Sequence, residues 1–293
     1  MIPKEVLKNI RRIQITTSRM VSDIFAGQYQ SVFKGKGMEF DEVRQYQPGD
    51  EIRSIDWNVT ARTGEPYIKK FVEERELTVM LVLDMSASSF FGTVKSLKMQ
   101  VAAQICSVLA FSAIRNNDKV GLINFSDRIE KFVPARKGTR HVLRVIREAL
   151  YGRPQGKGTD ISLALEYLNR VTTRKTVAFI ISDFYAGDCK KMLTLTNKRH
   201  DLIAITITDP LEISLPRAGL LKLYDSETKE GYFLDTSDPS ACHAYALRAQ
   251  AIARERQLLF RSCGIDAIDI RTDIPYSKSL FSFFRARERR MRT

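Results

Sequence analysis

The stretch Leu77-Thr78-Val79-Met80-Leu81-Val82-Leu83-Asp84 decides the fold of this 293-residue chain. A nearly continuous apolar run of strand length indicates a strand covered on both faces, as in a parallel sheet. Three similar apolar runs follow, at residues 120–125, 176–181 and 202–207, and residues 265–270 supply a last strand; segments of helical spacing alternate with them. This alternation predicts an α/β fold with a doubly wound, mainly parallel sheet and helices on both faces.

The composition shifts along the chain predict four parts. Residues 1–26 have apolar positions at helical spacing and predict a helix. Residues 27–75 are rich in glycine and short mixed runs, which favours a small β-rich module of turns and short strands. Residues 76–272 form the α/β domain, with a predicted hairpin after residue 220, and residues 273–293 form a basic C-terminal tail.

Composition limits the function classes. With 44% hydrophobic and 28% charged residues, the chain is an ordinary globular protein, neither collagen-like nor disordered. The four cysteines have no zinc spacing, and no apolar run is long enough to span a membrane, so we expect a cytoplasmic protein without a signal peptide. The net charge of +13 favours acidic partners without choosing among nucleic acid, anionic membrane and an acidic protein.

Three segments place oxygen-bearing side chains where ligands bind in such sheets, at the carboxyl ends of the strands. Asp84, Ser86 and Ser88 follow the first buried strand. Thr159 lies in a glycine-rich turn, and Asp183 follows another buried strand. Carboxylate and hydroxyl oxygens suit a hard divalent cation such as Mg²⁺. A site made mostly of hydroxyls would leave the cation electrophilic and open to an outside carboxylate, which is binding chemistry rather than turnover.

A purely structural interpretation competes with this one. Ser86 and Ser88 could cap the helix that follows, and Asp84 could accept backbone N–H groups. The presence of Thr159 and Asp183 at matching positions favours the metal site.

The set Asp84, Ser86, Ser88, Thr159 and Asp183 resembles the metal-ion-dependent adhesion site of von Willebrand factor A (vWA) domains. The resemblance covers roughly residues 77–270. It implies that these five residues hold Mg²⁺, or another divalent cation such as Mn²⁺, and that a Glu or Asp of a partner protein completes the shell.

The segment before the α/β domain carries a second pattern that resembles one protein family. The pattern Gly35-x-Gly37-x-Glu39-Phe40, then Arg44-x-Tyr46-x-x-Gly49-Asp50-x-x-Arg53-x-Ile55-Asp56-Trp57, then Ala61-Arg62 resembles the signature of the bacterial domain-of-unknown-function family 58. The resemblance implies an association with a MoxR-type AAA+ ATPase in a chaperone-like system. Many members carry two membrane helices before the signature, so this chain resembles the short form without a membrane span.

Trp57, the only tryptophan, is surrounded in the sequence by Asp50, Arg53, Asp56 and Arg62. One interpretation is an internal salt-bridge network that holds the small module together. The other is a partner-binding face formed by Arg53, Asp56, Trp57 and Arg62, because Trp and Arg are typical interface anchors.

Two other functions stay open as alternatives to a non-enzymatic, Mg²⁺-dependent protein-binding module. A metal-dependent phosphoryl-transfer enzyme of the haloacid-dehalogenase type would need an acid two residues after Asp84, where Ser86 stands. A nucleic-acid-binding protein would rest on the basic surface alone, since no nucleic-acid-binding motif is present. We therefore expect no enzyme activity, no small-molecule substrate and no nucleic acid, and we expect an acidic client protein.

Overall fold

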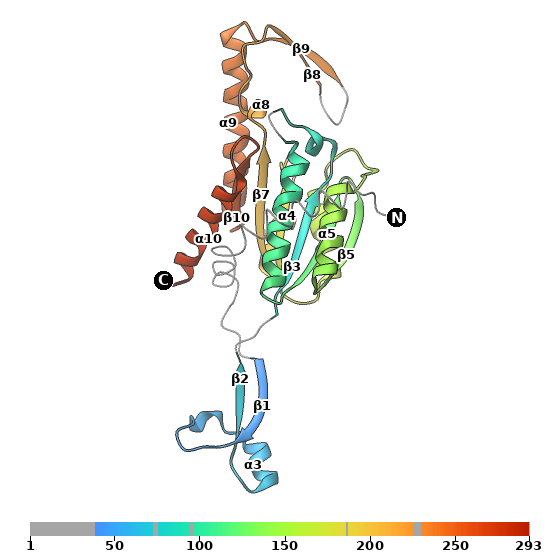
Figure 1. Ribbon diagram of the computed structural model, residues 1–293. Helices are drawn as coiled ribbons and strands as arrows, with labels where there is room; N and C mark the ends of the chain where they lie inside the picture. Colours follow the sequence, from blue (N-terminus) through green and yellow to red (C-terminus); the bar gives the residue numbers. More distant parts are fainter. Residues whose placement is uncertain (1–38, 73–75, 94–95, 186, 225–229, 293) are drawn as a thin grey trace.

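The computed structural model describes residues 39–72, 76–93, 96–185, 187–224 and 230–292. Its centre is a six-stranded sheet with the order β10-β7-β6-β3-β4-β5 (Figure 1). The strands are β3 (Thr78–Asp84), β4 (Lys119–Phe125), β5 (Ile129–Arg136), β6 (Val177–Ser182), β7 (Asp201–Thr208) and β10 (Asp266–Arg271). This confirms the predicted doubly wound sheet; β3, β4, β6 and β7 are buried along nearly their whole length, whereas β10 alternates buried and exposed residues.

The topology creates a binding position at the carboxyl end of β3. Five strands run parallel, and only the edge strand β5 pairs antiparallel with β4. From β3 the chain goes to β4 on one side, and it later returns to β6 on the other side of β3. The strand order therefore reverses at β3, and such switch points are where open α/β sheets bind ligands.

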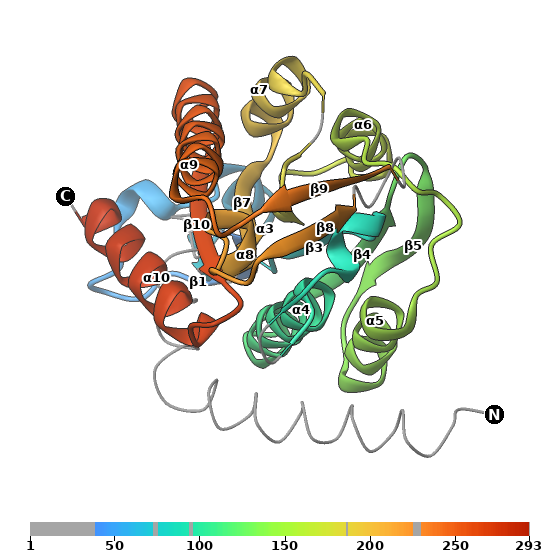
Figure 2. The same ribbon diagram turned by 90° about the horizontal axis from the view of Figure 1, so that it is seen from above.

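Helices cover both faces of the sheet (Figure 2). One face packs against α4 (Lys98–Arg115), α5 (Thr139–Tyr151) and α10 (Tyr276–Arg292). The other packs against α6 (Ile161–Val171), α7 (Lys190–Arg199) and α9 (Pro239–Ser262). Alternate residues of β3 explain the two cores: Leu81 and Leu83 enter the first, whereas Met80 and Val82 enter the second.

The C-terminal residues differ from the expected basic tail. They form α10, whose Leu280 and Phe284 are completely buried in the first core. Arg287 pairs with Asp201 (2.5 Å) and Asp266 (3.2 Å), which ties the helix to the ends of two strands. The aromatic and basic residues of this segment therefore belong to the α/β domain.

A hairpin and a short helix extend the carboxyl end of the sheet. After β7 come α8 (Pro210–Ile213) and the predicted hairpin of β8 (Leu220–Tyr224) and β9 (Gly231–Asp235), followed by the predicted long helix α9. Gly264 has φ +66°, a left-handed conformation that ends this helix as expected.

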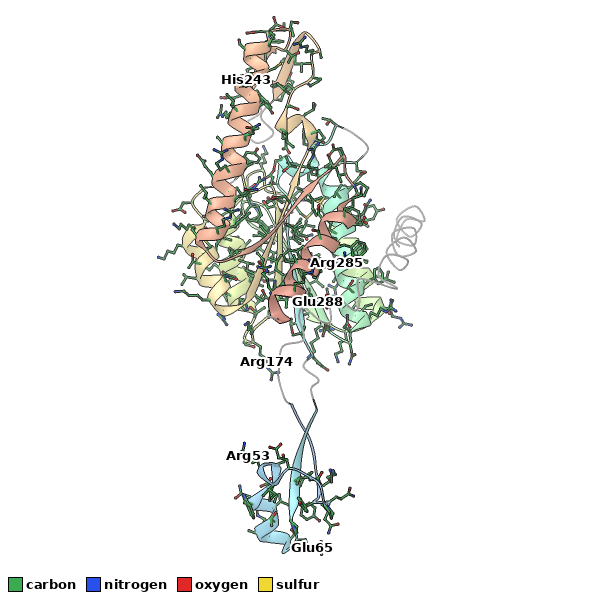
Figure 3. All side chains as sticks on the ribbon, turned by 90° about the vertical axis from the view of Figure 1, so that its left-hand side faces the viewer. Arg53, Glu65, Arg174, His243, Arg285 and Glu288 are labelled. Atoms are coloured by element: carbon green, nitrogen blue, oxygen red, sulfur yellow. The ribbon has the colours of Figure 1, made fainter. Side chains whose placement is uncertain are left out.

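The described part of the small module contains two antiparallel strands, β1 (Glu39–Gln45) and β2 (Tyr67–Val72). Between them lie a 3₁₀ turn (η2, Ile52–Ser54) and a helix, α3 (Trp57–Thr63), which the turn-rich composition did not predict. Asp56 caps α3 by accepting from the backbone N–H of Asn58 (3.0 Å). The module is drawn apart from the sheet in Figure 1, and Figure 3 labels its residues Arg53 and Glu65. The helix predicted over residues 1–26 lies outside the described residues.

Candidate functional site

Asp84 ends β3 and is almost fully buried, with 1% of its surface exposed. Its Oδ1 accepts from the backbone N–H of Ser86 (2.8 Å), and its Oδ2 accepts from the Ser182 hydroxyl at the end of β6 (2.5 Å). Burial, together with the negative charge of Asp183, raises the pKa of Asp84 to about 6. Both causes penalise its ionised form, so a nearby cation would stabilise that form.

The hydroxyls of Ser86 and Ser88 lie 3.0 Å apart. The 3₁₀ turn η3 (Ala87–Phe90) begins directly after Ser86, yet the Ser86 side chain makes no capping hydrogen bond to it, and α4 begins only at Lys98. The helix-capping interpretation therefore does not account for these two hydroxyls, although Asp84 does accept a backbone N–H as that interpretation expected. The two hydroxyls instead hydrogen-bond the carboxylates, Ser86 to Asp84 and Ser88 to Asp183, so the oxygen atoms of four proposed ligands lie together.

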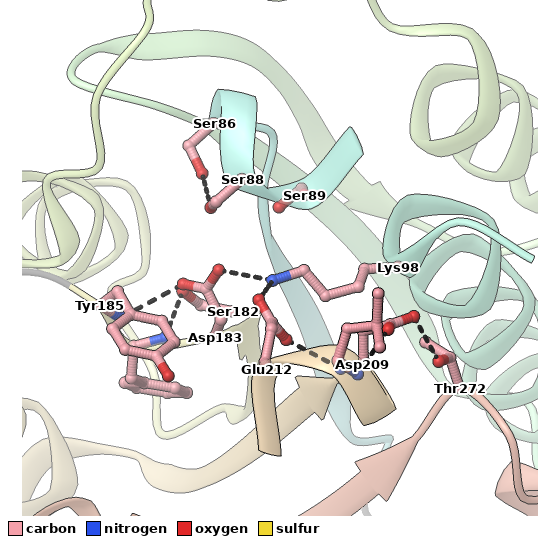
Figure 4. Close-up of polar contacts among 12 residues, drawn as sticks. Ser86, Ser88, Ser89, Lys98, Ser182, Asp183, Tyr185, Asp209, Glu212 and Thr272 are labelled. Atoms are coloured by element: carbon pink, nitrogen blue, oxygen red, sulfur yellow. Dashed lines mark hydrogen bonds and ion pairs between the residues drawn. The ribbon is translucent and has the colours of Figure 1, made fainter. Parts of the chain in front are cut away.

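Asp183 lies beyond the end of β6 and takes part in a buried ion pair that the sequence analysis missed (Figure 4). Lys98 Nζ donates to Asp183 Oδ2 (2.8 Å) and to Glu212 Oε1 of α8 (2.7 Å). Burial by itself would raise the pKa of Asp183, but the Lys98 ammonium outweighs it and holds that pKa below its usual value, with a hydrogen bond from Ser88 adding to the effect. Asp183 is therefore ionised and shared between Ser88 and Lys98.

The turn that carries Thr159 is held against the Asp84 segment. The Lys157 carbonyl accepts from the backbone N–H of Ala87 (3.3 Å), between Ser86 and Ser88. On its other side, the turn donates the N–H groups of Gln155 and Gly156 to Glu130 Oε1 (3.0 and 2.7 Å). Thr159 itself is half-buried.

Gly156 is required in this turn. A Cβ at this position would lie 2.1 Å from Asp127 Oδ1 and 2.2 Å from the Ser126 hydroxyl, both in the turn between β4 and β5. The predicted glycine-rich turn therefore has a steric reason, which is the close approach of two loops at the edge of the site.

The backbone after Asp183 is strained. Phe184 has φ +59°, a left-handed conformation that is rare for an aromatic residue. Its N–H donates to the Ser182 hydroxyl (3.0 Å), and its ring packs edge-on against Phe260 of α9 (centroid distance 4.8 Å). These contacts hold the turn that presents Asp183, as is common where strain persists near functional sites.

The donor set fits a hard divalent cation. The structure brings Asp84, Ser86, Ser88 and Asp183 to one edge of the sheet and places the Thr159 turn against them. Within the described ranges, no three His, Cys, Asp or Glu side chains cluster as a metal site, so any cation here depends on the hydroxyls. Binding of Mg²⁺ or Mn²⁺ itself stays a prediction.

The sequence analysis missed two side chains at the site, Lys98 and Glu212, and did not predict the contact of Ser182 with Asp84. Lys98 had a usable signal, because it lies four and seven residues before Ala102 and Ile105, which are buried. A lysine on the apolar stripe of a helix needs a buried partner.

The partner-binding residues proposed from the signature occupy different positions in the small module. Trp57 is 66% exposed, Arg53 and Arg62 are also exposed, and Asp56 is buried as the cap of α3. Of the four residues expected to form a salt-bridge network, Asp50 pairs with a residue outside that set, Arg44, through two hydrogen bonds (2.9 and 2.7 Å). Asp56 is thus a structural residue, whereas Trp57, Arg53 and Arg62 are available at the surface.

Comparisons with known proteins agree with the signature. Residues 42–256 match the family model described as "Protein of unknown function DUF58". An uncharacterized protein of Mycobacterium tuberculosis (strain ATCC 25618 / H37Rv) is 31% identical over 284 residues, which covers 96% of this chain and 89% of that protein. The uncharacterized protein YeaD of Bacillus subtilis (strain 168) is 24% identical over 161 residues, 55% of this chain and 38% of YeaD.

Similar solved structures include a vWA domain, that of SpRpn10, with a TM-score of 0.40, 11% identity and coverage of 70% of this chain and 94% of that one. Another is an aerotolerance-related membrane protein of Bacteroides fragilis NCTC 9343, with a TM-score of 0.47, 17% identity and coverage of 73% and 100%. These similarities concern the fold.

The expected cytoplasmic location is corrected by these comparisons. Because a similar structure belongs to a membrane protein, we no longer hold that expectation. Among the helices of the described residues, none has the length and apolar character needed to cross a membrane.

The family match covers most of the chain, and the M. tuberculosis relative matches nearly all of it. The chain therefore belongs to the DUF58 family of proteins of unknown function.

Proposed function

We propose that this protein is a non-enzymatic module that binds another protein through a divalent cation, Mg²⁺ or Mn²⁺. In this proposal Asp84, Ser86, Ser88, Thr159 and Asp183 hold the cation, and an acidic side chain of the partner completes its shell. The observation that carries it is the pair of hydroxyls 3.0 Å apart, without a capping role, beside the buried carboxylate of Asp84.

Exposed aromatic residues near the site support protein binding rather than catalysis. Phe90 and Phe91 follow Ser88 directly and are 44% and 39% exposed, and Tyr185, two residues after Asp183, is 42% exposed. Aromatic side chains are enriched at protein interfaces relative to the rest of the surface. The net charge of +13 would steer an acidic partner toward the module.

The proposed partners are a MoxR-type AAA+ ATPase and an acidic client protein. This part of the proposal rests on the family resemblance, and Trp57 with Arg53 and Arg62 offers an exposed second contact face for such a partner.

Calorimetric titration of the protein with Mg²⁺ and Mn²⁺ tests the metal site. Asp84→Ala should abolish binding while circular dichroism stays unchanged; equal binding by the variant would refute the site. A pull-down in Mg²⁺ or in EDTA then tests the partner. The proposal expects an AAA+ ATPase that is retained only with the cation and is lost with Asp84→Ala.

A further inference from the structure

Lys98 is the most unusual residue at the site. It lies in the first turn of α4 with only 3% of its side chain exposed, and its ammonium bridges Asp183 of the β6 turn and Glu212 of α8 (Figure 4). A buried lysine is costly unless it is paired, and this one has two carboxylate partners within 2.8 Å.

The ammonium stands beside both acidic residues of the proposed cation site. Lys98, Asp84, Ser89 and Asp183 line one small cavity, whose remaining wall is mainly apolar. Asp183 also accepts from the Ser88 hydroxyl, so one carboxylate separates the ammonium from a proposed metal ligand. A positive charge is therefore already paired with Asp183, one of the carboxylates that the proposed cation would use.

We propose that Lys98 is a built-in competitor of the divalent cation and sets the affinity of the site. The inference rests on the proposed function and deepens it. With Lys98 in place, the charge of Asp183 is partly neutralised, so a cation at Ser86 and Ser88 gains less from it; the two positive charges also repel each other. Without Lys98, Asp183 offers its full charge to the cation.

A purely structural role for Lys98, joining α4 to α8, makes a different prediction. In that case removal of the ammonium would destabilise the protein and leave the cation affinity unchanged or lower. The two roles are therefore separated by affinity and not by stability alone.

The test is calorimetric titration with Mg²⁺ and Mn²⁺. It compares the wild type, Lys98→Met, Glu212→Gln and the double variant that carries both substitutions. Lys98→Met leaves the buried Asp183 and the half-buried Glu212 without their cation, which lowers stability. The double variant removes the charge at position 212 and supplies the measurement if Lys98→Met does not fold. Lys119→Met is the matched control, because Lys119 begins β4 at the opposite end of the sheet, is 45% exposed and carries the same charge.

We expect Lys98→Met and the double variant to bind the cation at least about 10-fold more tightly than the wild type, the size of effect typical of groups next to metal ligands. The cation should also raise their melting temperatures more than that of the wild type. Lys119→Met should behave like the wild type, and Glu212→Gln, which leaves Lys98 to Asp183 alone, should bind the cation no more tightly than the wild type.

Two results would overturn the inference. Equal or weaker binding by both Lys98 variants, with a wild type that binds the cation, would refute competition and leave the proposed function standing. Absence of binding in the wild type and in every variant would refute the proposed function as well. Binding only after removal of Lys98 would support the inference strongly, provided that Asp84→Ala abolishes it in the same background.

Discussion

The Ser182 hydroxyl donates a 2.5 Å hydrogen bond to Asp84 Oδ2, although the two residues are 98 positions apart in the chain. The bond joins the carboxyl ends of β6 and β3, which are neighbours in the sheet. Ser182 also accepts from the Phe184 N–H, so one hydroxyl positions Asp84 and the turn that carries Asp183. Ser182, at the end of β6, therefore helps to position both acidic residues of the site, Asp84 and Asp183.

Asp183→Ala should weaken Mg²⁺ binding by about 10–100-fold if Asp183 acts through a water molecule. Complete loss would instead mean direct ligation. Lys98 would retain Glu212 as its partner in this variant, which limits the structural damage. Asp188→Ala, an exposed acid with the same charge, is the control, and calorimetry is the measurement. Unchanged affinity would exclude Asp183 from the site.

Gly156→Ala should move the turn that carries Thr159, because the new Cβ meets Asp127 and Ser126 at about 2 Å. Overpacking of this kind costs about 1–3 kcal/mol. The cation affinity should also fall if Thr159 is a ligand. Gly187→Ala is the matched control, since no atom lies within 4 Å of a Cβ there. Denaturant unfolding and calorimetry measure the two effects, and an affinity equal to that of the control would argue against a role for Thr159.

Phe284→Ala should lower the free energy of unfolding by about 3–5 kcal/mol, because the ring is completely buried between α10 and the sheet. Leu258→Ala on α9 removes a side chain that is 57% exposed and should change the free energy of unfolding by no more than about 0.5 kcal/mol. Urea unfolding followed by circular dichroism compares them. A small effect of Phe284→Ala would mean that α10 is not an integral part of the domain.

The contribution of His200 to stability should fall as the pH drops from about 6.5 toward 4, while Asp84, whose pKa is raised to about 6, contributes in the opposite direction. His200 is 1% exposed, and burial lowers its pKa to about 4, with the Arg199 charge adding to the effect. Below pH 6.5 the unfolded chain binds a proton at His200, whereas the folded protein does not bind one until the pH approaches 4. This difference lowers the free energy of unfolding by at most about 2 kcal/mol at pH 5.

His200→Gln should remove this contribution, so that the stability of the variant relative to the wild type increases as the pH falls from 7 to 5. The exposed His243, labelled near the far end of α9 in Figure 3, supplies the control, and His243→Gln should keep the wild-type slope. Chemical unfolding at pH 7, 6 and 5 provides the measurement. An equal slope in all three proteins would assign the pH dependence to other groups.

Most of the architecture could be predicted from local pattern. A strand buried on both faces is apolar at nearly every position, so the apolar residues 77–83 and the later runs predicted a parallel sheet with helices on both faces. The helix α3 was missed because seven residues are too few to show a period, although Asp56 and Gly64 had marked both of its ends. The role of α10 was missed because its arginines dominate the composition, whereas burial of Leu280 and Phe284 decides its place.

The sequence by itself determined the sheet, its carboxyl edge and the candidate oxygen ligands. Strand burial and turn formation depend on the types of residue that are close together in the chain, so a local pattern predicts them. Only the tertiary structure decided what surrounds those ligands. Lys98 and Asp183 are 85 positions apart, and Lys98 and Glu212 are 114 positions apart. Their ion pair exists because α4, the β6 turn and α8 meet at one end of the sheet, and no local pattern records which distant charge a buried carboxylate will find.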